Sequence, residues 1–591
     1  MRREEGQSKE EWPFQADQYF YLGDKRMVRK KVIIPSKRTV LSNNAPETPM
    51  APSPEEFGQK AKAKKLIKMY EDTKSLRRNW DTTWAEIADY VVPSKDQIFT
   101  DKFHKTKGDE KNDHLYDGSP EHFNELLASA LHSMLTNPAG QWFSLTTNKE
   151  EVDNDPEVKK YLQLLVRNIH DFLNNSNFQT EIHEFYIDLG SFGTGAILVV
   201  EDTEDIFRFL SIPIFELHVL ENSKGIIDTV FREDTISVRK AFERFGEDAF
   251  GEFAEELKKD FNKPVRTVHI IMPRTDIEFG KLNKRNKKFA SIHVWIDRDI
   301  ILKESGFDEN PYIISRWIKS SGETYGRSPA MKSLPDIRML NSMMQTTIRS
   351  AQKTVDPPLM IPDDGIMGRV NTIPGGLNSY RSGTEDRIFP LLTGGDIGIG
   401  LEMLRDVRDR IKQAFFIDQL QLKEGPQMTA TEVNQRVEEQ LRLLGPILGR
   451  QHFELLKPLI ARLISIMGRK KVLPENPPPI LAVKDGQLNV FFSSQIAKAQ
   501  RVADATNVQR FIESSAVAIQ IQPNAADIIN SEEIIKLNAR LFGVDQRIFR
   551  EDSEVEEIRQ DRNNEEEAMA EEQTNQANAK TAADLTKAQG G

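Results

Sequence analysis

The stretch from residue 325 to 444 constrains the fold most, because two helical patterns flank an insert rich in proline and glycine. The first pattern starts at Ser328 or at Pro335, since proline fits best in the first turn of a helix. The Asp-Pro-Pro sequence at 356–358 must stop it, because proline has no N–H to donate. The second pattern covers residues 400–416. These patterns predict two helices joined by an inserted lobe.

The second of these helices is apolar along one seam and densely charged elsewhere. The seam comprises Leu401, Leu404, Val407, Ile411 and Phe415. The other faces carry, among further charges, Arg405, Asp406, Arg408, Asp409 and Arg410. A helix of this kind can stand between neighbouring helices and water.

The composition excludes several classes of protein. The chain has 591 residues, of which 38% are hydrophobic and 29% are charged, which indicates a soluble chain rich in surface. It contains no cysteine, so disulfides, thiolate metal sites and cysteine nucleophiles are excluded. No apolar run reaches the ~18 residues that a membrane helix needs. The N-terminus lacks the apolar core of a secretory signal.

Charge is distributed unevenly along the chain. The formal net charge is −11, and residues 551–591 hold twelve Asp or Glu against four Lys or Arg, so that they carry −8 of it. A net acidic chain is a poor candidate for wrapping tightly around nucleic acid. Residues 1–55 are an irregular arm that is either a partner-docking or DNA-facing segment or a solvated leader. The basic candidates for contact in this arm are Lys25, Arg26, Arg29, Lys30 and Lys31.

The rest of the chain predicts an α+β fold that is mainly helical. Strand-type patterns occupy 196–201, 206–212, 226–231, 265–272, 289–297, 300–303 and 488–492. Helical patterns occupy 54–80, 84–91, 121–135, 156–174, 237–245, 250–261, 429–469, 494–514, 525–540 and 547–560. Pro446 and Pro458 should kink the helix at 429–469. Residues 561–591 form an acidic polar tail, either a frayed helix or a disordered segment.

Catalytic motifs are weak or incomplete. The glycine clusters at 190–195 and 395–400 lack the lysine of a phosphate-binding loop, so turn glycines are the better interpretation. His183 and Glu184 begin like a zinc-protease helix, but position 187 is isoleucine, so the second ligand is missing. The sequence therefore predicts no cofactor, no metal site and no enzyme, although an unmarked pair of carboxylates stays an alternative.

Four blocks of sequence resemble the portal proteins, or head-to-tail connectors, of short-tailed phages. They are WDTTWAEIADYVVP at 80–93, LASALHSMLTNP at 127–138, YGRSPAMKSLPDI at 325–337 and MTATEV at 428–433. The similarity spans about residues 57–550, so the arm at 1–55 lies outside it.

The resemblance implies a closed ring, typically of about twelve copies, at one vertex of a capsid. Its regions would be a wing at 56–325, a first stem helix at 326–352, a clip at 353–399 and a second stem helix at 400–416. A tunnel loop at 417–428 would follow, then a long kinked helix returning to the wing at 429–489 and crown helices at 490–560. The candidates that face the channel would be Gln419, Gln421, Lys423 and Glu424.

The resemblance also implies partners. They would be double-stranded DNA in the channel, the large terminase, the major capsid protein, a scaffold protein and a tail adaptor. The five charges of the second stem helix named above would pair between subunits, or would be solvated without a partner. Another structural ring of the phage neck or tail, or a nucleic-acid-processing enzyme, are the alternatives.

Overall fold

The computed structural model describes only part of the chain. The chain divides into residues 1–53 and residues 54–591, and all described residues belong to the second unit. The described residues are 54–95, 113–147, 152, 155–202, 204–274, 286–360, 389–390, 397–420, 444–478, 488–492, 508–516, 529–542, 550 and 552–588.

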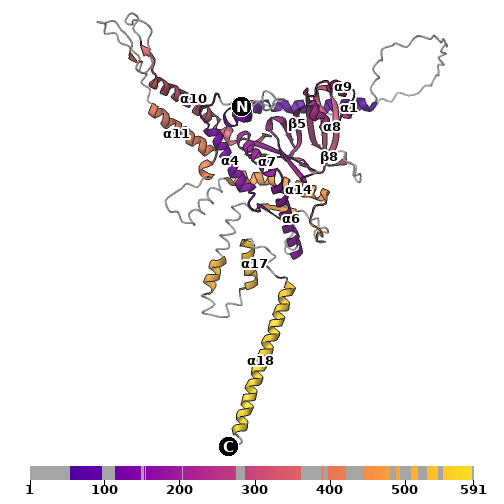
Figure 1. The fold of residues 1–591 in the computed structure, drawn as a ribbon, viewed down its shortest axis with the longest axis vertical. Helices are drawn as coiled ribbons and strands as arrows, with labels where there is room; N and C mark the ends of the chain where they lie inside the picture. The colour runs from indigo at the N-terminus through magenta and orange to yellow at the C-terminus, as the bar shows by residue number, and fades with distance from the viewer. Residues whose placement is uncertain are drawn as a thin grey trace, which may run out of the picture. The chain divides into compact units, whose positions relative to one another are not determined.

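Helices dominate this unit (Figure 1). Before the hairpin they are α1 (Pro54–Leu76), α2 (Arg78–Val91), α4 (Ser119–Leu135), α6 (Pro156–Asn175), α7 (Phe178–Phe192), α8 (Val238–Phe245) and α9 (Ala254–Leu257). After it come α12 (Ile417–Leu420), α14 (Lys457–Lys470), α17 (Ser531–Phe542) and α18 (Asp552–Ala588).

Four small antiparallel sheets complete the fold. The largest has the order β4-β5-β6-β7-β8, with bounds Leu217–Glu221, Ile227–Ser237, Pro264–Pro273, Phe289–Trp295 and Ile300–Phe307. A second has the order β3-β2-β9, with bounds Phe207–Ser211, Thr194–Glu201 and Tyr312–Arg316. The pairs β1-β12 (Phe143–Thr147, Leu488–Phe492) and β10-β11 (Leu359–Met360, Phe389–Pro390) form the others. The largest hydrophobic cluster joins α2, α4, α6, α7, β2, β9 and α14 into one core.

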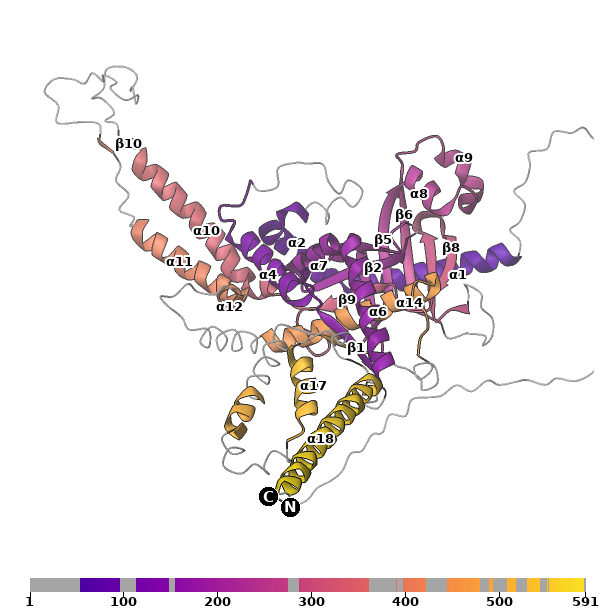
Figure 2. The ribbon, with the colours of Figure 1, turned by 60° about the horizontal axis from the view of Figure 1, so that its bottom comes forward.

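Two helices, α10 (Pro329–Val355) and α11 (Ile397–Ala414), form the helical hairpin that the sequence predicted. Figures 1 and 2 show them running side by side and projecting from the surrounding sheets and helices. At its far end, β10 pairs with β11 in antiparallel register.

The ends of the hairpin helices settle the open question about Pro335. The helix starts at Pro329, with Ser328 as its cap, and Pro335 lies inside it. The second helix runs from 397 to 414 rather than from 400 to 416. It ends before 416 because Phe416 adopts a left-handed conformation (φ 61°). The short helix α12 then covers the first residues of the segment expected to be a loop.

Other elements differ from the sequence prediction as well. Strands β1, β4 and β9 were not predicted, and the helix expected at 250–261 ends at Leu257. The break expected between 80 and 84 lies at Arg77 instead, so Trp80 and Trp84 belong to one helix, where their rings pack together. The helix α18 passes through position 560 and continues to 588, so no helix end marks the boundary expected there. Residues 429–443 lie outside the described part of the chain.

Candidate functional site: the helical hairpin and its root

The hairpin is held together by an apolar seam between its two helices. Leu404, Val407 and Ile411 of α11 are buried, as are Ile337 and Leu340 of α10. Successive apolar residues three or four apart share one helix face, so these side chains form the contact. The remaining faces of both helices carry polar, charged and some exposed apolar residues.

Polar contacts fix the inner half of the hairpin to the body. Arg408 donates to the buried carboxylate of Asp117, with Nη2 2.6 Å from Oδ2. The side chain of Asn341 accepts from the backbone of Tyr116 at 2.7 Å and donates to the carbonyl of His114 at 3.0 Å. The part of the hairpin nearest the body is therefore held by hydrogen bonds to the segment that precedes α4.

The root of the hairpin, where the chain enters α10, is built on a close approach of two backbones. A Cβ on Gly326 would lie 2.1 Å from the carbonyl oxygen of Gly193, so no larger residue fits. The N–H of Gly326 donates to Thr194 Oγ1 at 2.9 Å. Ser328 donates to the carbonyl of Ser191 at 2.6 Å, and its hydroxyl also accepts from the first turn of α10.

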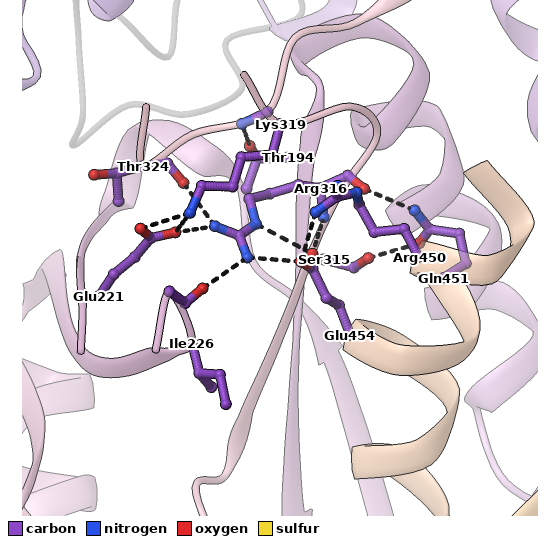
Figure 3. A network of polar contacts seen from close by, with 12 residues as sticks. Thr194, Glu221, Ile226, Ser315, Arg316, Lys319, Thr324, Arg450, Gln451 and Glu454 are labelled. Carbon is purple, nitrogen blue, oxygen red and sulfur yellow. Dashed lines mark hydrogen bonds and ion pairs between the residues drawn. The ribbon is translucent and has the colours of Figure 1, made fainter. Parts of the chain in front are cut away.

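A buried ion cluster adjoins this root (Figure 3). Arg316, at the end of β9, has a side chain that is only 4% exposed and contacts Glu454 and Glu221. Glu454 Oε1 lies 2.6 Å from Arg316 Nη2, and Lys319 Nζ lies 2.6 Å from Glu221 Oε1. Gln451 donates to the carbonyl of Arg316 at 2.9 Å. The cluster thus joins β9 and β4 to the helical segment 444–470, whose last part is α14.

A π-helical turn presents Glu454 to this cluster. The turn covers His452–Leu456 and lies just before Pro458. Because Pro458 has no N–H, the carbonyl of Glu454 cannot receive the usual helical hydrogen bond, and a widened turn relieves the misfit. The sequence predicted a kink at Pro458, and the structure places the irregularity one turn earlier.

The electrostatics of the cluster favour the charged form of Arg316. Burial lowers its pKa, but hydrogen bonds and charge from Glu454 and Glu221 outweigh burial, so the pKa is raised. Removing one partner from such a pair leaves a buried charge uncompensated, which costs about 3–5 kcal/mol. The ion cluster is therefore expected to stabilise the fold beside the root.

Sequence comparison shows the family to which this chain belongs. The sequence profile of the family described as "Bacteriophage head to tail connecting protein" matches residues 63–549. The chain belongs to this family. The match includes the hairpin, its root and most of the remaining described residues. It also confirms the resemblance that the four sequence blocks indicated.

Individual relatives cover most of the chain. A "Probable portal protein" of Bordetella phage BPP-1 is 30% identical over 540 residues, which are 90% of this chain and 96% of the relative. A "Portal protein" of Salmonella phage epsilon15 is 28% identical over 508 residues, 84% of this chain and 90% of the relative. A chain from a structure titled "Virion of native gene transfer agent (GTA) particle" covers 71% of this chain and 89% of its own length, with 11% identity and a TM-score of 0.33.

The structure separates the five charged candidates of the second hairpin helix into two groups. Arg408 pairs with Asp117 of the same chain, and Arg410 Nη1 lies 3.6 Å from Asp336 on α10. Arg405, Asp406 and Asp409 are exposed on α11. Among the described residues, these three have no ion-pair partner within the chain.

Most other candidates lie outside the described part of the chain. These are Gln421, Lys423 and Glu424, and the arm residues Lys25, Arg26, Arg29, Lys30 and Lys31. Gln419 is described, and α12 places its side chain in a half-buried position. Its amide oxygen is buried and has no hydrogen-bond partner among the described residues.

The sequence analysis did not predict the ion cluster that adjoins the root. Arg316 and Glu454 are separated by 138 positions, so no local spacing marks them as partners. Among the described residues, no group of three or more His, Asp or Glu could hold a metal ion. No described helix is long and apolar enough to cross a membrane.

Proposed function

We propose that this chain is the subunit of a phage portal, a ring at one vertex of the capsid through which DNA enters and leaves. The family match over residues 63–549 carries the proposal, and the relatives named as portal proteins support it. In this proposal copies of the chain form a closed ring, which requires two different faces on each subunit.

In this proposal, different segments of the chain have different roles in the ring. The hairpin of α10 and α11 would be the stem, the insert between them the clip, and residues 417–428 the tunnel loop, with Gln419, Gln421, Lys423 and Glu424 toward the channel. A surface without a continuous basic lining holds phosphate weakly, so DNA can slide past it. The large terminase and then a tail adaptor would dock at the clip, while the major capsid and scaffold proteins would surround the ring.

The tunnel loop offers a test of the conduit. Deletion of residues 419–426 should leave ring assembly intact and impair the packaging or retention of DNA in heads built with the variant. Particle counts by electron microscopy and encapsidated DNA after nuclease treatment measure the two effects separately. Normal DNA-filled heads from the variant would argue against a channel role for this segment.

A further inference from the structure

The two helices of the hairpin expose opposite charges on opposite sides. Glu402, Asp406 and Asp409 are exposed on α11, and they are the acidic edge. Each lies two positions from buried Leu404, Val407 or Ile411, which is about 200° around a helix. The acidic edge therefore faces away from α10.

The basic edge is the corresponding outward face of α10. Thr347 faces α11, because a Cβ added to Gly400 would lie 3.4 Å from its hydroxyl. Arg349, two positions later, is on the opposite side of the helix, and Lys353 follows it by one turn. Both are exposed. From position 337 to 355, α10 contains no Asp or Glu, so this face carries positive charge only.

The inner hairpin charges are already engaged within the chain. Arg408 and Arg410 pair with Asp117 and Asp336, and Arg338 Nε lies 2.8 Å from Glu86 Oε1. In contrast, no residue of either edge has an ion-pair partner among the described residues. The chain thus leaves unpaired the charges that face outward on its two opposite sides.

Exposed apolar side chains accompany the acidic edge. Ile399 is 58% exposed and Met403 is 53% exposed, and each precedes a member of that edge by three positions on α11. Residues three apart are neighbours on a helix surface. A face that combines apolar and acidic side chains suits a protein partner better than water or DNA phosphate.

From these observations we propose that the acidic edge of one copy docks on the basic edge of the next copy. The contact joins two different faces, so its repetition forms a ring when the rotation between neighbouring copies divides a full turn. The inference deepens the proposed function and rests on it, since it names the surface and the polarity of the subunit contact. Arg405 is also exposed on α11, three positions after Glu402 and four before Asp409, so one positive charge borders the acidic edge.

The register of the two edges also predicts how the hairpins are inclined. Gly400 is level with Thr347, so in an antiparallel pair Glu402 is level with about position 345 of α10. Arg349 lies about one helical turn, or ~6 Å, farther from the root. To bring Glu402 beside Arg349, adjacent hairpins must therefore be offset along their length by about that amount, as they are when helices in a ring are tilted from its axis.

Charge reversal tests the pairing. The variant Glu402→Lys with Asp406→Lys, and the variant Arg349→Glu with Lys353→Glu, should each remain monomeric under conditions in which the unmodified chain forms rings. Mixed one to one, the two variants should form rings of alternating subunits, because each then offers the other an opposite charge. Mass photometry and negative-stain images report both results. The matched control is Glu243→Lys with Glu252→Lys, which changes as much charge on exposed residues of the body and should form normal rings.

Each outcome bears on a different claim. Rings from either single variant would overturn the pairing, and impaired DNA packaging in those rings would instead assign the acidic edge to the channel. Mixtures that stay monomeric although both variants keep the melting temperature of the unmodified chain would also overturn it. If the unmodified chain never forms rings, including with scaffold protein, the proposed function itself fails.

Discussion

The root of the hairpin and its outward edges use the same kinds of residue in opposite ways. Beside the root, buried Arg316 pairs with half-buried Glu454, and hydrogen bonds join the two side chains. At the edges, Glu402 and Arg349 are exposed, without an ion-pair partner among the described residues. The contrast indicates that the root is completed by one chain, whereas the edges need a second copy.

The largest difference between the two regions should appear when one glutamate is removed from each. Glu454→Ala leaves Arg316 buried beside one carboxylate fewer, so the free energy of unfolding should fall by about 3 kcal/mol. Glu402→Ala, the matched change on an exposed edge, should alter it by less than about 0.5 kcal/mol. Urea unfolding of both variants measures the two values. Equal losses would remove the distinction between root and edge.

A comparable pair of changes concerns glycine. Gly326→Ala would place a Cβ 2.1 Å from a backbone oxygen that cannot move aside easily, and should cost about 2 kcal/mol. Gly400→Ala meets only the side chain of Thr347 at 3.4 Å and lies in a helix, so it should be neutral or slightly stabilising. Thermal unfolding distinguishes them. A stable Gly326→Ala protein would show that the two backbones at the root can separate without loss.

Acidic pH should lower the stability of the large sheet in the body more than that of the hairpin. His269 and His293 stack at 3.9 Å in the large sheet, and burial, with nearby positive charge, lowers the pKa of both well below 6.5. Arg232, Arg244 and Lys303 supply that charge. Above pH 6.5 neither state binds the protons, but below it the unfolded chain binds them and the folded chain does not, so stability falls as the pH falls.

At about one pH unit below 6.5, the loss should reach roughly 1 kcal/mol for each histidine. Hydrogen exchange at pH 7.5 and 5.5, corrected for the intrinsic rate, should show lost protection in β6 and β7. Helices α10 and α11 contain no histidine, so local opening of the hairpin should change less. Unchanged protection in the sheet would contradict burial of a neutral pair.

The smallest effect is expected where the hairpin meets the body. Arg408→Ala removes the cation from buried Asp117, but the arginine side chain is 33% exposed, so the loss should be about 1 kcal/mol. Arg405→Ala, an exposed neighbour on the same helix, is the control and should be near neutral. Denaturant midpoints of the two proteins provide the measurement, and equal midpoints would mean that the Asp117 contact adds nothing.

The hairpin was predictable from sequence because its signals are local. Apolar residues three and four apart, a serine cap and the Asp-Pro-Pro stop all lie within one stretch of chain. Pro335 was harder to place, since a proline in the second turn and one in the first turn give similar patterns. The position at which the second helix ends depends on the backbone of Phe416, which no pattern marks.

The root was not predictable, for a physical reason. Its partners come from β4, β9 and the long helix, and they meet only after those elements have packed. In the sequence, strand β9 is a short and mostly apolar segment without a distinctive pattern. Glu454 is one of many carboxylates in a charged chain, so nothing marks it as a partner of Arg316. Folding creates this site by bringing distant residues together. No local sequence pattern can therefore predict it.

Electron cryomicroscopy of the unmodified chain under assembling conditions tests the central claim most directly. The account predicts closed rings in which the hairpins stand side by side, acidic edge against basic edge, around a hole wide enough for duplex DNA. Solid particles, or particles in which α10 and α11 lie buried inside a single globule, would contradict it.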